Sequence, residues 1–160
     1  MPLQALHRSE CWKLSPLFEE RTELRAVVDC VLEGHLGRYE GVTYQELDDS
    51  RWARHCIRDD DYTGHGGESP NQVGARMFAA IEAELAVIGE GNLIVVSHGG
   101  AIAQLLARAL GTRPAFGPQY MMQNAAVSEL VFDPAPELLT LNHHDHLPEE
   151  LRLDPARRDD

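Results

Sequence analysis

The segment best suited to chemistry by residue type and spacing is Ser97-His98-Gly99-Gly100. An apolar run at 93–96 precedes it and predicts a strand buried on both faces, and the helical pattern that follows predicts a helix ending at Gly111. His98 is thereby placed at the carboxyl end of a buried strand, where open α/β sheets bind ligands. The paired glycines let a ligand approach the backbone, and the free N–H groups of a helix start favour an anion. From these residues alone, His98 is either a site residue or a structural one.

A second cluster of chemical groups is Asn142-His143-His144-Asp145-His146. Three imidazoles and a carboxylate within five residues suit a transition metal. Alternation at a strand end places His144 and His146 on one face and His143 on the other, so these ligands are not expected to converge. The acidic triplet at 59–61 is interpreted as a solvated turn. The sequence therefore predicts neither a metal site nor a cofactor.

The elements that must position these groups alternate between helices and strands. Ser69-Pro70-Asn71-Gln72 and Thr43-Tyr44-Gln45-Glu46 both match a capping box, which marks the start of a helix. In order, the pattern predicts a helix at 3–13, a helix restart at 15–16, a strand at 24–31, a helix at 43–53, a polar loop at 57–68, a helix at 69–89, the strand and helix described above, a loop at 111–118, and strands at 126–132 and 138–142.

This order predicts an α/β fold, a three-layer sandwich with a mainly parallel sheet and an antiparallel strand at one edge. The length of 160 residues fits one domain, taken as 1–147, followed by a polar tail at 148–160. A net charge of -12 argues against a nucleic-acid or anionic-membrane partner. Three cysteines without metal spacing and no signal-peptide pattern lead us to expect a cytoplasmic protein.

Several motifs then stand in a characteristic order. They are a Glu33-x-x-x-Gly37-x-x-Glu40-Gly41 loop, Gly66-Gly67-Glu68-Ser69 with Arg76 in the next helix, Ser97-His98-Gly99-Gly100, Asn124-Ala125-Ala126-Val127-Ser128, and the run from Asn142 to Leu147. Together they resemble the histidine phosphatase superfamily, the phosphoglycerate-mutase-like proteins. The resemblance extends over residues 2–147.

The resemblance implies roles for individual residues. His98 would contact the transferring phosphoryl group, and Glu33 would protonate the leaving oxygen, as this chemistry requires. Gly99 and Asn124 would line the pocket. The alternative for Glu33 is a loop carboxylate that caps backbone N–H groups, and Asn124 suits a turn equally well. Glu68 is expected to serve a helix dipole, and Arg76 to be a structural partner rather than a phosphate ligand.

The sequence also departs from the family pattern, at the nucleophile and at a phosphate-binding arginine. Family members carry an Arg-His-Gly whose histidine is the phosphorylated nucleophile, and no Arg-His-Gly occurs in these 160 residues. Met1-Pro2-Leu3-Gln4-Ala5 matches a stretch in which the family has a phosphate-binding arginine in place of Ala5, and Arg8 is the candidate substitute. His7, His35, His55 and His65 could replace the nucleophile, but each is interpreted as a surface or loop histidine.

We therefore expect a chain that lacks the family's first strand, either as an incomplete copy or as a shortened relative. Phosphatase activity is expected to be weak or absent, with a small phosphorylated or carboxylated molecule as the ligand. Two alternatives remain open. One is an enzyme that uses Glu33 and His98 as an acid–base pair for dehydration or isomerisation, and the other is a non-catalytic binding module. An uncovered sheet edge also predicts a homodimer.

Overall fold

A computed structural model describes residues 31–120 and 122–152 of the chain. The predicted helix at 3–13, the helix restart at 15–16, Arg8 and all but the last residue of the strand predicted at 24–31 lie outside these residues. Within them the elements follow the order η3 (Gly37–Tyr39), α2 (Tyr44–Asp49), α3 (Trp52–Arg58), α4 (Pro70–Ile88), α5 (Gly99–Ala109), η4 (Pro114–Tyr120), β1 (Val127–Val131), β2 (Glu137–His143) and η5 (Glu149–Leu151), in which η denotes a 3₁₀ helix.

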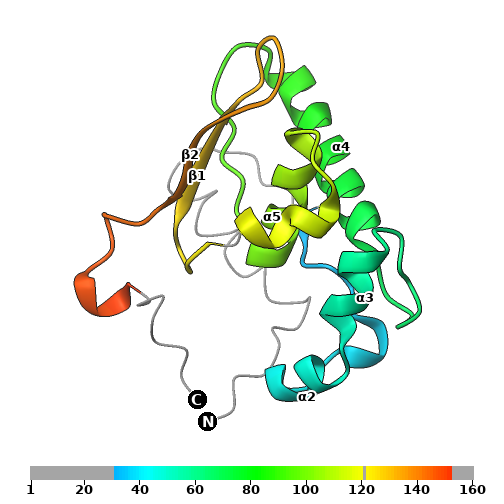
Figure 1. Ribbon diagram of the computed structural model, residues 1–160. Coiled ribbons are helices and arrows are strands. Elements are labelled where there is room, and N and C mark those ends of the chain that lie inside the picture. Colours follow the sequence, from blue (N-terminus) through cyan, green and yellow to red (C-terminus); the bar gives the residue numbers. More distant parts are fainter. Residues whose placement is uncertain (1–30, 121, 153–160) are drawn as a thin grey trace.

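Helix α5 lies between α4 and the two strands β1 and β2 (Figure 1). Helix α4 starts at the predicted capping box, in which Ser69 accepts from Gln72 N and the Gln72 side chain accepts from Ser69 N. It ends before Gly89, close to the predicted boundary. Helix α5 ends where predicted, with Gly111 in the left-handed region at φ +67°.

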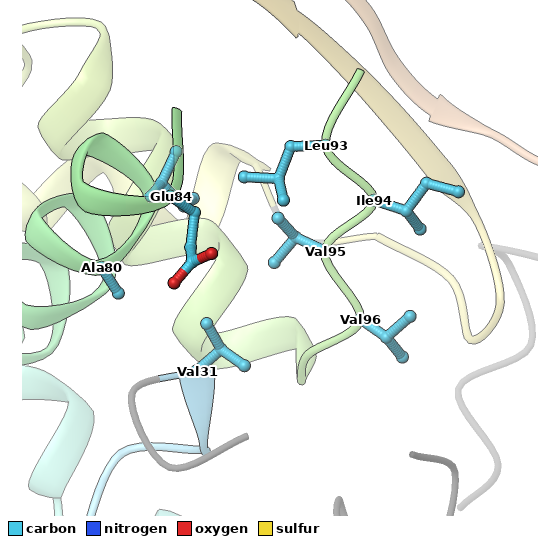
Figure 2. A pocket seen from close by; sticks show the side chains of 8 residues that line it. Val31, Ala80, Glu84, Leu93, Ile94, Val95 and Val96 are labelled. Carbon is cyan, nitrogen blue, oxygen red and sulfur yellow. The ribbon is translucent and has the colours of Figure 1, made fainter. Parts of the chain in front are cut away.

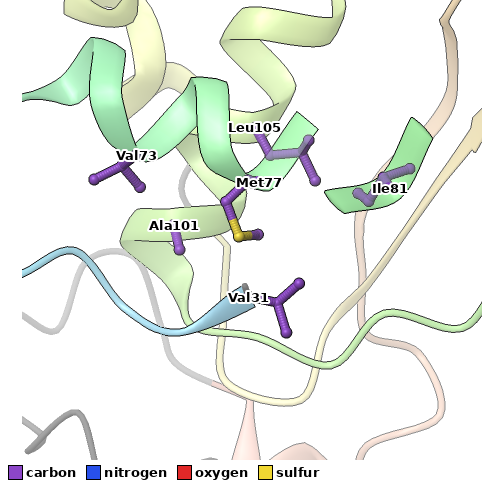
Figure 3. Close-up of a cluster of buried hydrophobic side chains, with 6 residues drawn as sticks. All are labelled: Val31, Val73, Met77, Ile81, Ala101 and Leu105. Carbon is purple, nitrogen blue, oxygen red and sulfur yellow. The ribbon is translucent and has the colours of Figure 1, made fainter. Parts of the chain in front are cut away.

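Two hydrophobic clusters hold these helices in place. One face of α4, on which apolar residues recur at helical spacing, is buried and packs against α5 and Val31, as Figure 3 shows. The other side of α5 packs against η4 and the hairpin. The first cluster contains Val31, Val73, Met77, Ile81, Ala101 and Leu105, and the second contains Ala103, Leu106, Ala107 and Tyr120. Helix α5 is therefore buried on two sides, which fixes its N-terminus relative to the chain around it.

The two C-terminal strands pair as an antiparallel hairpin, with Val127 opposite His143 and Val131 opposite Glu137. Both strands were predicted, and they form the one sheet within the described residues. Alternate side chains of the hairpin face α5, with Leu130 and Leu138 packed on the second cluster. The described residues thus show an α/β structure with a small antiparallel sheet.

Residues 93–96 depart from the prediction of a strand buried on both faces. They run extended beside α4 but form no ladder with either strand of the described sheet. Leu93 and Val95 pack on the first cluster, whereas Ile94 is 62% exposed and Val96 40%. The apolar run predicted a strand buried on both faces, and within the described residues it is neither paired as a strand nor buried on both faces, because pairing and burial of the second face depend on neighbours in space that the run itself does not specify.

Smaller differences concern boundaries. The helix predicted at 43–53 breaks at Arg51, which has a left-handed φ of 58°, so α2 and α3 are separate. Helix α3 then extends into the region predicted as a polar loop. The loop at 111–118 contains most of η4, and η5 lies inside the predicted tail. None of the helices within residues 31–120 and 122–152 has the length and apolarity needed to cross a membrane.

Candidate functional site

The carboxylate of Glu33 lies at the N-terminus of α5. Its Oε2 accepts a hydrogen bond from Gly100 N at 3.2 Å, and its Oε1 accepts one from Gly34 N at 2.8 Å. A Cβ on Gly100 would lie 2.9 Å from Oε1 of Glu33, so only glycine leaves room for the carboxylate. Glu33 and the Ser97–Gly100 turn, 67 residues apart in sequence, therefore meet as the motif resemblance implied.

His98 is the N-cap residue of α5, with an extended backbone at φ -106° and ψ 156°. Its side chain makes no capping hydrogen bond, and its Nε2 is buried without a hydrogen-bond partner among the described residues. A buried imidazole nitrogen without a partner costs free energy that a ligand oxygen could recover. The site thus offers an imidazole nitrogen, a carboxylate and the N–H groups of a helix start.

The strand-like segment that leads into His98 is tied to the chain that leads into Glu33. Ser97 Oγ donates to Val31 O in a short hydrogen bond. Val31 is 8% exposed and belongs to the first cluster. Packing of this cluster and one side-chain hydrogen bond therefore bring the two functional segments together.

Arg76 and Glu68 stand behind the Glu33 loop. Arg76 Nε donates to Glu68 Oε1 at 2.7 Å, and its Nη2 donates to Glu68 Oε2 at 3.0 Å and to Glu33 O at 3.1 Å. The expectation that Arg76 has a structural partner is met. Glu68 does more than interact with a helix dipole, because it pairs with Arg76 and accepts from His35 N at 2.9 Å.

His65 is the main surprise near this loop. It was interpreted as a surface or loop histidine, but its ring is 2% exposed and lies between Tyr39 and Tyr62, at centroid distances of 6.2 and 5.6 Å. Trp52 approaches edge-on at 6.1 Å. Burial lowers the pKa of His65 from 6.5, and within residues 31–120 and 122–152 no side-chain partner lies within hydrogen-bond distance of its ring nitrogens. The flanking glycines suggested a loop, and no signal in the sequence indicated that aromatic rings 3 to 26 residues away would enclose the histidine.

His65 also joins two loops. Its carbonyl accepts from Arg38 N at 3.0 Å, and a Cβ on Gly37 would lie 2.3 Å from that carbonyl oxygen. Gly67 is equally confined, because its Cβ would lie 2.0 Å from His35 O. The two glycine-rich segments therefore interlock through backbone contacts, which anchors the far end of the Glu33 loop.

Gly99 and Asn124 are the other described residues predicted to bind the ligand. Gly99 is the first residue of α5, next to Gly100. Asn124 is exposed in the turn closed by Ala126 N donating to Gln123 O at 3.1 Å. This geometry agrees with the turn interpretation of Asn124, while its role in binding stays a prediction.

The 142–146 cluster differs from the alternation that was predicted. Strand β2 ends at His143, and the rings of His143 and His146 stack at 6.1 Å, so they do not lie on opposite faces. Nδ1 of His144 lies 2.6 Å from Asn142 O, and Nε2 of His146 lies 3.0 Å from Ala125 O. Within the part of the chain that the structure describes, no group of three metal-ligating side chains converges.

An apolar groove of about 60 Å³ lies apart from Glu33 and His98, between α4 and residues 93–96 (Figure 2). Val31, Ala80 and Ile81 line it together with Glu84, whose carboxylate points into the space between the helix and the extended segment. Its lining is mostly aliphatic, so the candidate for chemistry remains the start of α5.

Comparison with known proteins agrees with this arrangement. The family model described as histidine phosphatase superfamily (branch 1) matches residues 17–143. The chain belongs to the histidine phosphatase superfamily. A comparison with curated proteins gives no match.

Solved structures of superfamily members superpose on the chain. A mycobacterial glucosyl-3-phosphoglycerate phosphatase, in complex with VO3, is 30% identical with a TM-score of 0.67, and the match covers 84% of this chain and 71% of that protein. A protein described as mycobacterial hydrolase 2 is also 30% identical with a TM-score of 0.67, covering 88% and 69%. A phosphoserine phosphatase from Entamoeba histolytica, in complex with 3-phosphoglyceric acid, is 23% identical with a TM-score of 0.62, and the match covers 76% of this chain and 63% of that protein. At this identity the match shows a shared fold alone.

Proposed function

We propose that the start of α5 binds a small phosphorylated or carboxylated molecule, with His98 and Glu33 as the chemical groups and Gly99 as a backbone contact. The observation that carries the proposal is the contact of the Glu33 carboxylate with Gly100 N–H in the first turn of α5, whose N-cap His98 has an Nε2 that is buried without a partner among the described residues. The N–H groups of a helix start stabilise an anion by about 0.3–1 kcal/mol at an exposed site and up to about 2 kcal/mol when partly buried.

The proposed ligand class also takes support from relatives. A glucosyl-3-phosphoglycerate phosphatase has been solved with inorganic phosphate, and it is 30% identical to this chain. In a phosphoryl transfer, His98 would donate to an equatorial oxygen and Glu33 would give a proton to the leaving oxygen. Asn124 and Arg8 complete the proposed ligand-binding set, with no metal and no cofactor.

Turnover of phosphate esters is proposed to be weak or absent in the chain as it stands. The sequence offers no Arg-His-Gly, so a phosphohistidine route would need another nucleophile. His65, one of the four other candidates, is held between two tyrosine rings and is ill-placed for attack. For the domain at 1–147 we further propose a three-layer sandwich with a mainly parallel sheet, in a cytoplasmic homodimer.

The acid–base alternative rests on the same pair of residues. A carboxylate on a glycine-rich loop and an unpartnered imidazole could move a proton between two positions of a small molecule without a covalent phosphate. In this case the wild-type chain would turn over a substrate that carries no phosphate ester, and Glu33→Gln would abolish that turnover.

Two measurements on the purified chain test the proposal. Inorganic phosphate and vanadate are titrated by NMR, and aryl phosphate hydrolysis is measured in parallel. We expect the NMR chemical shifts of the Gly99 and Gly100 amides to change and saturate as phosphate is added, and these changes to disappear in His98→Ala. We expect aryl phosphate hydrolysis near background. Robust hydrolysis abolished by His98→Ala would overturn the proposed inactivity. No change at these amides would overturn the anion site and leave the binding-module alternative.

A further inference from the structure

The main chain on either side of Gly34 is held by a pair of charged side chains. Arg76, in the second turn of α4, donates from Nη2 to Glu33 O at 3.1 Å. Glu68 accepts from His35 N at 2.9 Å and donates from its own N to His35 O at 2.8 Å. The backbone is therefore anchored at residues 33 and 35, while Gly34 between them is the residue type with the greatest conformational freedom.

The two anchors are themselves joined by an ion pair. Arg76 Nε and Glu68 Oε1 are 2.7 Å apart, and each side chain is 21% exposed. Charge-assisted hydrogen bonds of this kind are short and roughly twice as strong as neutral ones, and partial burial reduces their screening by water. The Arg76 guanidinium thus links the main chain at Glu33 to the Glu68 carboxylate, which in turn holds the main chain at His35.

Anchoring at this place determines where the Glu33 side chain ends. With the carbonyl of Glu33 fixed, the short side chain reaches Gly34 N at 2.8 Å and Gly100 N at 3.2 Å. A rotation of the 33–34 peptide would carry the carboxylate away from the start of α5. We propose that Arg76 and Glu68 are positioning residues that hold Glu33 against Gly100 of α5.

The inference rests on the proposed function, because the position of Glu33 matters for chemistry only if the start of α5 binds a ligand. Its structural content can nevertheless be measured without any ligand. Arginine is suited to the task, since its planar guanidinium donates in several fixed directions at once. Lysine has one ammonium group and could not serve Glu68 and Glu33 O with the same geometry.

The test measures amide hydrogen exchange at Gly100 by NMR in four variants. Arg76→Gln and Arg76→Lys disturb the anchor, and Glu33→Ala provides the reference for a lost carboxylate. Arg113→Gln is the matched control, because Arg113 Nε pairs with Asp60 Oδ2 at a similar 2.8 Å but lies elsewhere on the surface. Amides in the middle of α5 report whether each variant is folded.

We expect Gly100 exchange to accelerate roughly tenfold in Arg76→Gln and Glu33→Ala, the effect of losing a hydrogen bond to a charged group. Arg76→Lys should accelerate it less, and Arg113→Gln should leave it unchanged. Equal acceleration across all α5 amides in both Arg76 variants would indicate a merely structural role and overturn the proposal, as would wild-type exchange at Gly100 in either variant. A wild-type protein that binds no phosphate would refute the proposed function instead, because Gly100 exchange still reports on the anchor.

Discussion

Two glycines in the central helices provide a direct test of which contacts are rigid. A Cβ added to Gly100 would lie 2.9 Å from Glu33 Oε1, and one added to Gly74 would lie 2.9 Å from Gln104 O. The two distances are equal, but the atoms differ. The carboxylate is the end of a flexible side chain, whereas Gln104 O belongs to the backbone of α5, which is packed against α4.

The expected free energies follow from this difference. Glycine to alanine in a helix stabilises by roughly 0.5–1 kcal/mol through propensity. In Gly100→Ala this gain opposes the loss of one hydrogen bond to a charged group. Such a bond contributes about 1.5 kcal/mol to stability, and less where water takes the place of the lost partner. The net change in unfolding free energy should stay within about 1 kcal/mol.

Gly74→Ala gains the same propensity but forces two helices apart. Overpacking of this kind costs about 1–3 kcal/mol, so we expect a net destabilisation of roughly 0.5–2 kcal/mol. Urea unfolding followed by circular dichroism measures both variants, and phosphate titration measures binding by Gly100→Ala. Phosphate binding should be retained in this variant, because displacement of the anionic Glu33 carboxylate leaves the N–H groups at the start of α5 in place.

The refuting results are specific. If Gly100→Ala is destabilised as much as Gly74→Ala, the Glu33 carboxylate is held as rigidly as a backbone atom. If Gly74→Ala is as stable as the wild-type chain, the contact between α4 and α5 at this position is looser than the structure indicates. Either result would refute the reasoning from the nature of the contacting atom.

Two further predictions concern buried titratable groups. The pKa of His65 is lowered by burial, so the folded state binds fewer protons than the unfolded state between the lowered value and 6.5. The free energy of unfolding should therefore increase with pH up to about 6.5. His65→Phe should flatten this dependence, measured by urea titrations at several pH values. A pH profile unchanged by this substitution would contradict the assignment. Burial raises the pKa of the Cys56 thiol to about 11, so Cys56 should resist a thiol reagent at pH 8 until the chain unfolds. Rapid labelling at Cys56 itself in the folded chain, located by peptide mass spectrometry because the sequence also contains Cys11 and Cys30, would contradict its burial.

Local features of this protein were determined by the sequence itself. The capping boxes at Thr43 and Ser69, the left-handed Gly111 and the apolar face of α4 each depend on residues within a few positions of one another. The order of the motifs was sufficient to predict the superfamily, and the Glu33 loop and the Ser97–Gly100 turn of those motifs contact each other through Glu33 and Gly100. Short-range signals of this kind can be read from the chain because the groups that interact are neighbours in it.

Other features were decided only by the tertiary structure. The burial of His65 depends on three aromatic rings from separate segments. The exposure of Ile94 depends on what lies beside residues 93–96, and the anchor at Glu33 depends on Arg76 reaching it across 43 positions. Residue types allowed these contacts without specifying them, because burial and long-range hydrogen bonding are set by the packing of α4 and α5. The roles proposed for His98 and Glu33 depend on the same packing, since it brings the Glu33 carboxylate to the start of α5.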